Sequence, residues 1–284
     1  MRCRCLLCLM IMLVIGCSES PTDNQDNQQP DRPSLVRVPS EAATIQEGID
    51  LIENNDTVLV ADGLYTGSGN RDIDLGGKSV VLLSENGPLK TVIDCGGSES
   101  APHFAFTGFG GEAGNVIDGF TISGAYGAQG PVLNLKFTSP VIRNCILVDN
   151  VATVSGGAIR CKNASPTFLN CTFINNTAPI GGAVYLLTGS EPNFTNCIIA
   201  FSSGGGAIES FTSSFPTLVC SDLFGNVGGD WTGVIAAQLG SNGNISLDPL
   251  FCELSDHRLN SDSPCLPTNN SCGIVIGAAE ATCD

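Results

Sequence analysis

Side chains that could hold a ligand recur at matched positions in three successive segments of the chain. An arginine, a tyrosine and a glutamate occupy equivalent places, and a lysine, a leucine and a phenylalanine follow two residues later. These residues are Arg160, Tyr185 and Glu209, then Lys162, Leu187 and Phe211. Residues two apart in a strand share a face, so the six predict one exposed patch. Aromatic and charged side chains on such a patch could grip sugar rings, and the alternative is an ordinary solvated sheet face.

The same region offers little of what polysaccharide cleavage requires. A calcium-dependent lyase needs clustered carboxylates with a basic residue beside them, and an inverting hydrolase needs two or three acids at fixed spacing. The central segments carry one nearby acid, Asp149, among Lys136, Arg143, Arg160 and Lys162. The two histidines, His103 and His257, lie far apart in the chain. We therefore expect no catalytic residues, metal or cofactor, and keep an enzyme as the alternative.

A repeat with a period in the twenties positions these side chains. Three segments ending at Cys145, Cys171 and Cys197 align, and a looser copy ends at Cys220, so the cysteines step by 26, 26 and 23 residues. Gly-Gly-Ala elements run in phase, beginning at residues 156, 181 and 205. A period of this length indicates one structural unit that is repeated and stacked.

Each repeat holds short runs of strand-forming residues broken by Gly, Asn, Ser and Pro. Three strands and three turns in about 22–26 residues make one coil of a parallel β-helix. The sequence therefore predicts an all-β fold, a right-handed single-stranded parallel β-helix of roughly eight coils over residues 57–250. The period-two rule predicts these inward-facing residues: Cys145, Leu147, Ile159, Cys171, Phe173, Val184, Cys197, Ile199 and Ile208.

Two further rows have a structural interpretation. Outward-facing apolar residues predict a strip that residues 227–243 or a partner chain should cover, which also suggests self-association. These are Ile146, Val148, Ile174 and Ile198. Asparagines beside the cysteines predict a ladder of stacked amides, with a ligand-binding row as the alternative. These are Asn144, Asn150, Asn170, Asn176 and Asn196.

Both ends of such a stack need caps. Residues 37–56 predict a short N-terminal helix, with Thr44 as N-cap and Ile45, Ile49 and Ile52 on one side. Residues 251–284 predict an irregular C-terminal cap linked by two disulfides among Cys252, Cys265, Cys272 and Cys283. All three pairings are open, and zinc binding is the alternative. The cysteines of the repeats should be buried and free: Cys95, Cys145, Cys161, Cys171, Cys197 and Cys220.

The first residues have the pattern of an export signal. Residues 1–16 combine an early basic pair with an apolar run. Val14-Ile15-Gly16-Cys17 resembles the bacterial lipobox, which implies lipidation of Cys17 and an outer-membrane or cell-surface lipoprotein; a plain secretory signal is the alternative. Residues 17–36 predict a disordered tether.

The chain is strongly acidic, with a formal net charge of −16. This charge argues against nucleic acid and anionic membrane surfaces as partners, and disfavours an acidic polysaccharide.

Three groups of residues resemble known families. Gly181-Gly182-Ala183-Val184 and its copies, with Phe173-Ile174-Asn175-Asn176, resemble the repeats of chlamydial-type polymorphic outer membrane proteins. The stretch from Ala43 to Tyr65 is similar to the entry of pectin-lyase-like β-helices. Residues 248–278 resemble the tail of bacterial secreted β-helix repeat proteins. These resemblances imply the fold, and they are weak guides to activity.

The sequence thus favours a non-catalytic, surface-anchored β-helix lipoprotein that serves adhesion or binds a polysaccharide or cell-surface glycan. The alternatives are a polysaccharide lyase or glycoside hydrolase of the pectin-lyase-like superfamily and a purely structural envelope component.

Overall fold

Short strands separated by tight turns wind into stacked coils, because Asn and Gly residues at the bends adopt the left-handed conformation that a sharp corner requires. The computed structural model describes residues 34–284 except 109–113, 212, 254–256, 279–281 and 284. The predicted signal segment 1–16, the predicted lipidation site Cys17 and the predicted tether as far as residue 33 lie outside the described residues. Asn144 (φ 52°), Asn170 (φ 52°) and Asn196 (φ 56°) mark the same corner in three successive coils.

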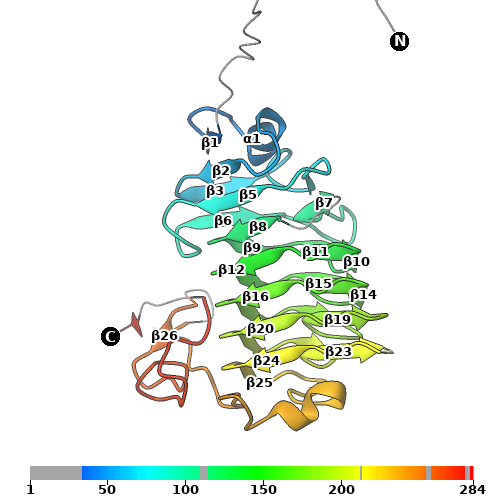
Figure 1. Ribbon diagram of the computed structural model, residues 1–284, viewed down its shortest axis with the longest axis vertical. Coiled ribbons are helices and arrows are strands. Elements are labelled where there is room, and N and C mark those ends of the chain that lie inside the picture. The colour runs from blue at the N-terminus through cyan, green and yellow to red at the C-terminus, as the bar shows by residue number, and fades with distance from the viewer. Residues whose placement is uncertain (1–33, 109–113, 212, 254–256, 279–281, 284) are drawn as a thin grey trace, which may run out of the picture. The chain divides into compact units, whose positions relative to one another are not determined.

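The described strands of successive coils pair in parallel, which confirms the parallel β-helix (Figure 1). An eight-stranded sheet contains β1 Leu35–Val38, β2 Thr57–Val60, β5 Val81–Ser84, β8 Val116–Asp118, β12 Val141–Arg143, β16 Thr167–Leu169, β20 Asn193–Thr195 and β24 Thr217–Val219. A seven-stranded sheet contains β3 Gly63–Thr66, β6 Thr91–Asp94, β9 Thr121–Ser123, β13 Ile146–Val148, β17 Thr172–Ile174, β21 Ile198–Ala200 and β25 Asp222–Phe224.

Two four-stranded sheets complete the central coils. One contains β10 Tyr126–Gln129, β14 Val151–Ser155, β18 Thr177–Ala178 and β22 Ser203–Gly204. The other contains β11 Leu133–Lys136, β15 Ile159–Lys162, β19 Val184–Leu187 and β23 Ile208–Phe211. The remaining pairs are β4 Ile73–Asp74 with β7 Phe106–Gly108, and β26 Leu259–Asn260 with β27 Thr282–Cys283. A full central coil therefore has four strands where the sequence predicted three.

The N-terminal end is closed by α1, which spans Ile45–Leu51. Thr44 is its N-cap and accepts a hydrogen bond from the Glu47 amide (3.2 Å), as predicted. Ile45, Ile49 and Ile52 are at most 1% exposed and join the core. The chain enters the fold earlier than predicted, because β1 begins at Leu35, inside the stretch expected to be tether, and pairs with β2.

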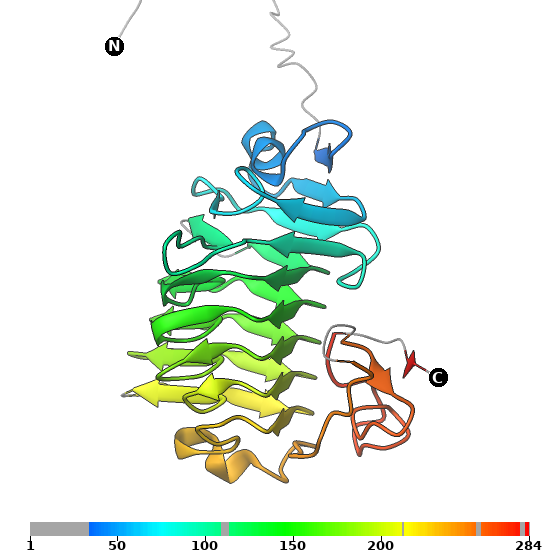
Figure 2. The same cartoon turned by 180° about the vertical axis from the view of Figure 1, so that it is seen from behind.

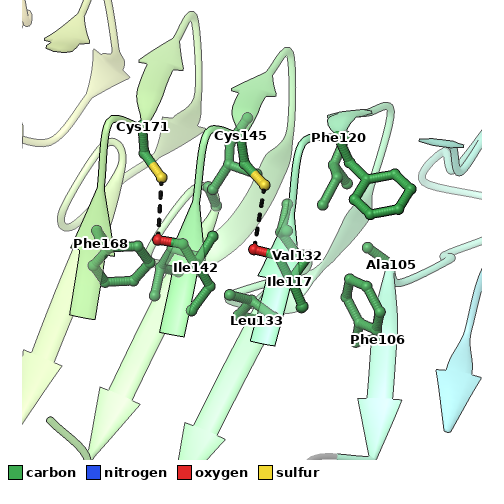
Figure 3. Close-up of a cluster of buried hydrophobic side chains, with 14 of the residues drawn as sticks. Ala105, Phe106, Ile117, Phe120, Val132, Leu133, Ile142, Cys145, Phe168 and Cys171 are labelled. Atoms are coloured by element: carbon green, nitrogen blue, oxygen red, sulfur yellow. Dashed lines mark hydrogen bonds between the residues drawn. The ribbon is translucent and has the colours of Figure 1, made fainter. Parts of the chain in front are cut away.

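The inward rows form one continuous core (Figure 3). Every residue that the period-two rule placed inside is at most 2% exposed. The Cys145 and Cys171 thiols donate hydrogen bonds to the carbonyl oxygens of Ile117 (3.7 Å) and Ile142 (3.4 Å) in the preceding coil. Cys95, Cys145, Cys161, Cys171 and Cys197 are buried and free, which confirms the prediction for these five. Burial raises the pKa of the Cys145 and Cys171 thiols well above the ordinary value.

The prediction for Cys220 was wrong, because the last copy of the repeat is shifted by one residue. Thr195 pairs with Val219, so Cys220 aligns with Asn196 and Ser221 takes the position of the ladder cysteine. Cys220 also has the left-handed φ (48°) of the corner asparagines. Its side chain therefore does not occupy the interior row, and it bonds to Cys272.

The two disulfides are Cys220–Cys272 and Cys252–Cys283, with Cα–Cα distances of 6.1 and 6.2 Å. Cys265, which the sequence grouped with the disulfide cysteines, is free and buried. Its thiol instead donates a hydrogen bond to Asp222 (3.3 Å), beneath the C-terminal segment.

The C-terminal residues lie along the flank of the coils, and an earlier segment closes the end (Figures 1 and 2). Ile235 lies in the 3₁₀ helix η1, which spans Gly233–Gln238, and is fully buried against the core at the last coil. Trp231, just before this helix, also packs on the core. Residues 249–253 and 257–278, here called the strap, cover the outward apolar strip that the sequence had left to 227–243 or a partner. The strip residues Ile146, Val148, Ile174, Ile198 and Ala200 contact Phe251, Leu259, Cys265, Ile276 or Ala278.

Asp222 links the strap to the last coil. Its carboxylate accepts hydrogen bonds from the Leu247 amide (3.1 Å) and the Cys265 thiol, and the side chain is fully buried. Burial is the main cause that raises the pKa of Asp222 to about 7, and the nearby Asp230 and Asp248 add to it. The folded protein therefore favours the protonated carboxyl, which costs less to bury.

We predict that Cys171→Ser is tolerated. Ser221 already occupies this row, and its hydroxyl donates to the Val219 carbonyl oxygen (3.0 Å). The carbonyl oxygen of Leu169, which accepts from the Cys171 thiol, offers the introduced hydroxyl the same kind of acceptor. Since a satisfied buried hydroxyl costs little, the free energy of unfolding should fall by less than about 1 kcal/mol in urea titrations. A loss of about 3 kcal/mol would contradict this packing.

We predict that Cys272→Ala loosens the strap and leaves the coils intact. Removing a cross-link between residues 52 apart should lower the free energy of unfolding by about 2–4 kcal/mol. The uncovered isoleucines should then bind a hydrophobic dye and promote association, while the β signal in far-ultraviolet circular dichroism is unchanged. Peptide mapping of unreduced protein checks the pairing, and a Cys265–Cys272 bond would refute it.

We predict a pH dependence that Asp222→Asn removes. A folded pKa near 7 against about 4 when unfolded means that the native state binds the extra proton between these values. Stability from this group is complete below about pH 4 and is lost as the pH rises through about 7. The wild type minus variant difference in Tm should therefore be larger at pH 5 than at pH 8. An identical pH profile in both proteins would exclude Asp222 as the cause.

Candidate functional site

The candidate ligand face is the outer surface of the sheet β11-β15-β19-β23. Four parallel strands in continuous register place equivalent residues side by side. The first column is Asn134, Arg160, Tyr185 and Glu209, and the second is Lys136, Lys162, Leu187 and Phe211. The structure thus brings all six sequence-predicted residues into two adjacent columns, and adds Asn134 and Lys136 one coil earlier. We call these eight residues the outer face.

Strand alternation explains why these side chains point outward. Ile159, Val184 and Ile208 precede them in the strands and are at most 2% exposed. Lys136 and Lys162 are exposed, Tyr185 and Leu187 are half-buried, and Phe211 is 59% exposed. Phe211 is one of several exposed phenylalanines, with Phe137 and Phe215, and it is the one that belongs to the outer face.

The polar groups of the first column are only partly satisfied. Arg160 donates from Nη1 to Asn134 Oδ1 (3.2 Å), while its buried Nε has no hydrogen-bond partner in the described structure. Glu209 lies two coils away from Arg160 in the same column. Its carboxylate accepts a hydrogen bond from the Gly206 amide (2.7 Å). The positive charge of Arg160 partly offsets the burial that raises the pKa of Cys161 to about 12.

The asparagine row forms the predicted ladder. Asn196 donates to Asn170 (3.0 Å), Asn170 donates to Asn144 (3.0 Å), and Asn144 donates to Asp118 (2.7 Å). Asp118 also accepts from Arg143 Nε at 2.7 Å, so the ladder ends on an ion pair. The amides of Asn144 and Asn170 are therefore satisfied within the ladder, which supports the structural interpretation, while the buried Oδ1 of Asn196 has no hydrogen-bond partner in the described structure. A cavity of about 320 Å³ is lined by the three asparagines and by Ile274, Val275, Gly277 and Ala278 of the strap.

Asn150 and Asn176 form a second, fully buried ladder at the following bend. Asn150 donates to Asn176 Oδ1 (3.1 Å), and Asn176 donates to the Leu147 carbonyl oxygen (2.8 Å). These amides satisfy backbone groups at the bend, which is a structural role.

A second cavity, also of about 320 Å³, lies near the N-terminal end and was missed by sequence reasoning. His103 Nδ1 lies 2.8 Å from Asp72 Oδ2, and Asp72 Oδ1 accepts from the Phe104 amide (2.8 Å). Arg71 lines the same cavity and donates to the Cys95 carbonyl oxygen (2.7 Å). The histidine and aspartate are 31 residues apart with no motif, so only the folded coils reveal the pair.

A metal site and a membrane-spanning helix were also considered for the described residues. No group of three or more His, Cys, Asp or Glu residues that could hold a metal ion occurs among the residues that the structure describes. Within the same ranges, no helix is long and apolar enough to cross a bilayer.

One comparison with known proteins gives a match. Residues 170–187 are similar to the Chlamydia polymorphic membrane protein repeat. The matched residues run from the corner Asn170 through β17 and β18 to the end of β19, and so include Tyr185 and Leu187 of the outer face. No curated protein and no solved structure gives a significant match. The matched repeat and the β-helix together support a β-helix repeat protein.

Proposed function

We propose that this chain is a surface-anchored β-helix that binds glycans through its outer face. The observation that supports this most is the pair of columns on one parallel sheet. Tyr185 lies beside Arg160 in the first column, and Phe211 lies beside Leu187 and two coils from Lys162 in the second. An aromatic ring offers an apolar face to the C–H side of a sugar, while guanidinium and ammonium groups donate to its oxygens. The coil spacing of about 4.8 Å repeats these contacts along the stacking direction.

We predict that Tyr185→Ala and Phe211→Ala each weaken glycan binding. Losing one aromatic contact should raise Kd about tenfold, corresponding to about 1.4 kcal/mol. The measurement is a glycan panel followed by titration calorimetry of the best ligand. Leu64→Ala is the matched control, because Leu64 is 67% exposed on a different sheet. Full binding by both aromatic variants would exclude this face, and a panel without any ligand would contradict glycan binding.

Anchoring through lipid on Cys17 is part of the same proposal. The Chlamydia repeat supports a location at the outer membrane or surface, and the lipobox-like residues supply the means of attachment. We predict that Cys17→Ser releases the protein into the soluble fraction in a detergent partition assay, whereas Ser18→Ala leaves it attached. A Cys17→Ser protein that stays with the membranes would contradict lipid anchoring.

The enzyme alternative has one observation in its favour, the His103–Asp72 pair beside a cavity. Asp72 holds one ring nitrogen, and the other nitrogen has no hydrogen-bond partner in the described structure, which is an arrangement suited to a general base. A lyase or hydrolase should release reducing ends from some polysaccharide on the panel, and His103→Gln should abolish this release. Release that survives His103→Gln would remove this pair from the mechanism.

A further inference from the structure

Three cations of the outer face lie together without a counter-ion. Lys136 pairs with Lys162 on the adjacent strand, so their Cα atoms are about 4.8 Å apart, and Arg160 lies two residues before Lys162 on the same face. No carboxylate of the described chain lies within ion-pair distance of any of them. The protein has only 12 lysines and arginines against 28 acids, so three neighbouring unpaired cations are an unusual use of them.

Arg160 gives the strongest evidence for an anionic ligand in this cluster. The side chain is only 9% exposed, yet its Nε has no acceptor, and its one hydrogen bond goes to the neutral Asn134. A buried charged group is normally paired, because burial without a partner is costly. Nε is enclosed, but Nη2 makes no hydrogen bond in the described structure, so the guanidinium retains a donor for an anion that the described residues do not supply.

The pairing of Lys136 with Lys162 points the same way. Like charges directly across neighbouring strands repel each other, and an anion between them removes the repulsion. The next two coils contribute Tyr185 and then Phe211 to the same columns, together with Glu209, whose carboxylate accepts a hydrogen bond from the Gly206 amide. A chain running along the stack would therefore meet the cations first and the aromatic rings next.

We propose that the outer face takes an anionic polysaccharide, whose sulfate or carboxylate groups bind Lys136, Arg160 and Lys162 while its sugar rings contact Tyr185 and Phe211. This inference rests on the proposed function and names the ligand class of that site. It also revises the expectation from net charge. At physiological ionic strength charges further than about 8 Å apart are largely screened, so the field at the outer face comes mainly from its three cations and its one acid, Glu209.

The test uses three polymers with one backbone: dextran, carboxymethyl dextran and dextran sulfate. The full chain should bind at least one of the two charged polymers ten times more tightly than dextran, and the preferred one identifies the anion. The binding should weaken as salt is raised. The double variant Lys136→Gln/Lys162→Gln should lose at least tenfold in affinity, and Arg160→Gln should lose a similar factor. Lys90→Gln removes the same charge from an exposed site outside the outer face and should bind as the wild type does.

Each other outcome has a definite meaning. Equal affinity for dextran and both charged polymers would overturn the anionic ligand and leave glycan binding in place. Charged polymers that bind the double lysine variant as tightly as the wild type would also overturn it. Binding to none of the polymers, with no ligand on the glycan panel, would overturn the proposed function itself. Binding to vesicles of anionic phospholipid in place of the polymers would assign the cluster to a membrane and contradict the proposal. Because both lysines are exposed, the double variant remains informative if Arg160→Gln fails to fold.

Discussion

Parallel pairing in fixed register is the constraint on which the rest of this molecule depends. Each residue lies beside its equivalent in the next coil, so a side chain must fit its own copy as well as its other neighbours. Phe168 and Phe194 satisfy this by stacking with ring centroids 4.8 Å apart, and the asparagine amides satisfy it by bonding head to tail. The same register brings Arg160, Tyr185 and Glu209 into one column outside. The interior therefore determines the geometry of the surface that we assign to ligand binding.

The strap shows how the fold deals with an apolar outer sheet. Ile146, Ile174 and Ile198 would leave a hydrophobic surface if bare, and each isoleucine contributes about 1.5–3 kcal/mol when buried. The strap is held by backbone contacts as well, because the Gly277 amide donates to the Asn196 carbonyl oxygen (2.8 Å) and the Ala278 amide to Thr172 Oγ1 (2.9 Å). One outward face is thus sealed by the chain itself, while Phe211 on the outer face is 59% exposed in the described structure.

The features of the fold that follow from the repeat period could be predicted from the sequence. The inward rows, the helix capped by Thr44 and the two outer columns were all predicted, because a repeat determines both the period and the face of each residue. The shift of the last repeat copy was not predicted. Its one-residue offset at Cys220 becomes visible only in the structure, where Val219 pairs with Thr195. The strap and the His103–Asp72 pair were also out of reach. Both depend on contacts between segments that lie outside the repeat pattern.

The central claim is that a ligand lies along the outer face, across neighbouring coils. Affinity measured against a series of oligosaccharides of increasing length tests it most directly. Four coils span about 15 Å, so affinity should rise with each added sugar until the oligosaccharide reaches this length and then level off. A monosaccharide that binds as tightly as the longest oligosaccharide would show that the site is a single pocket and would contradict this account.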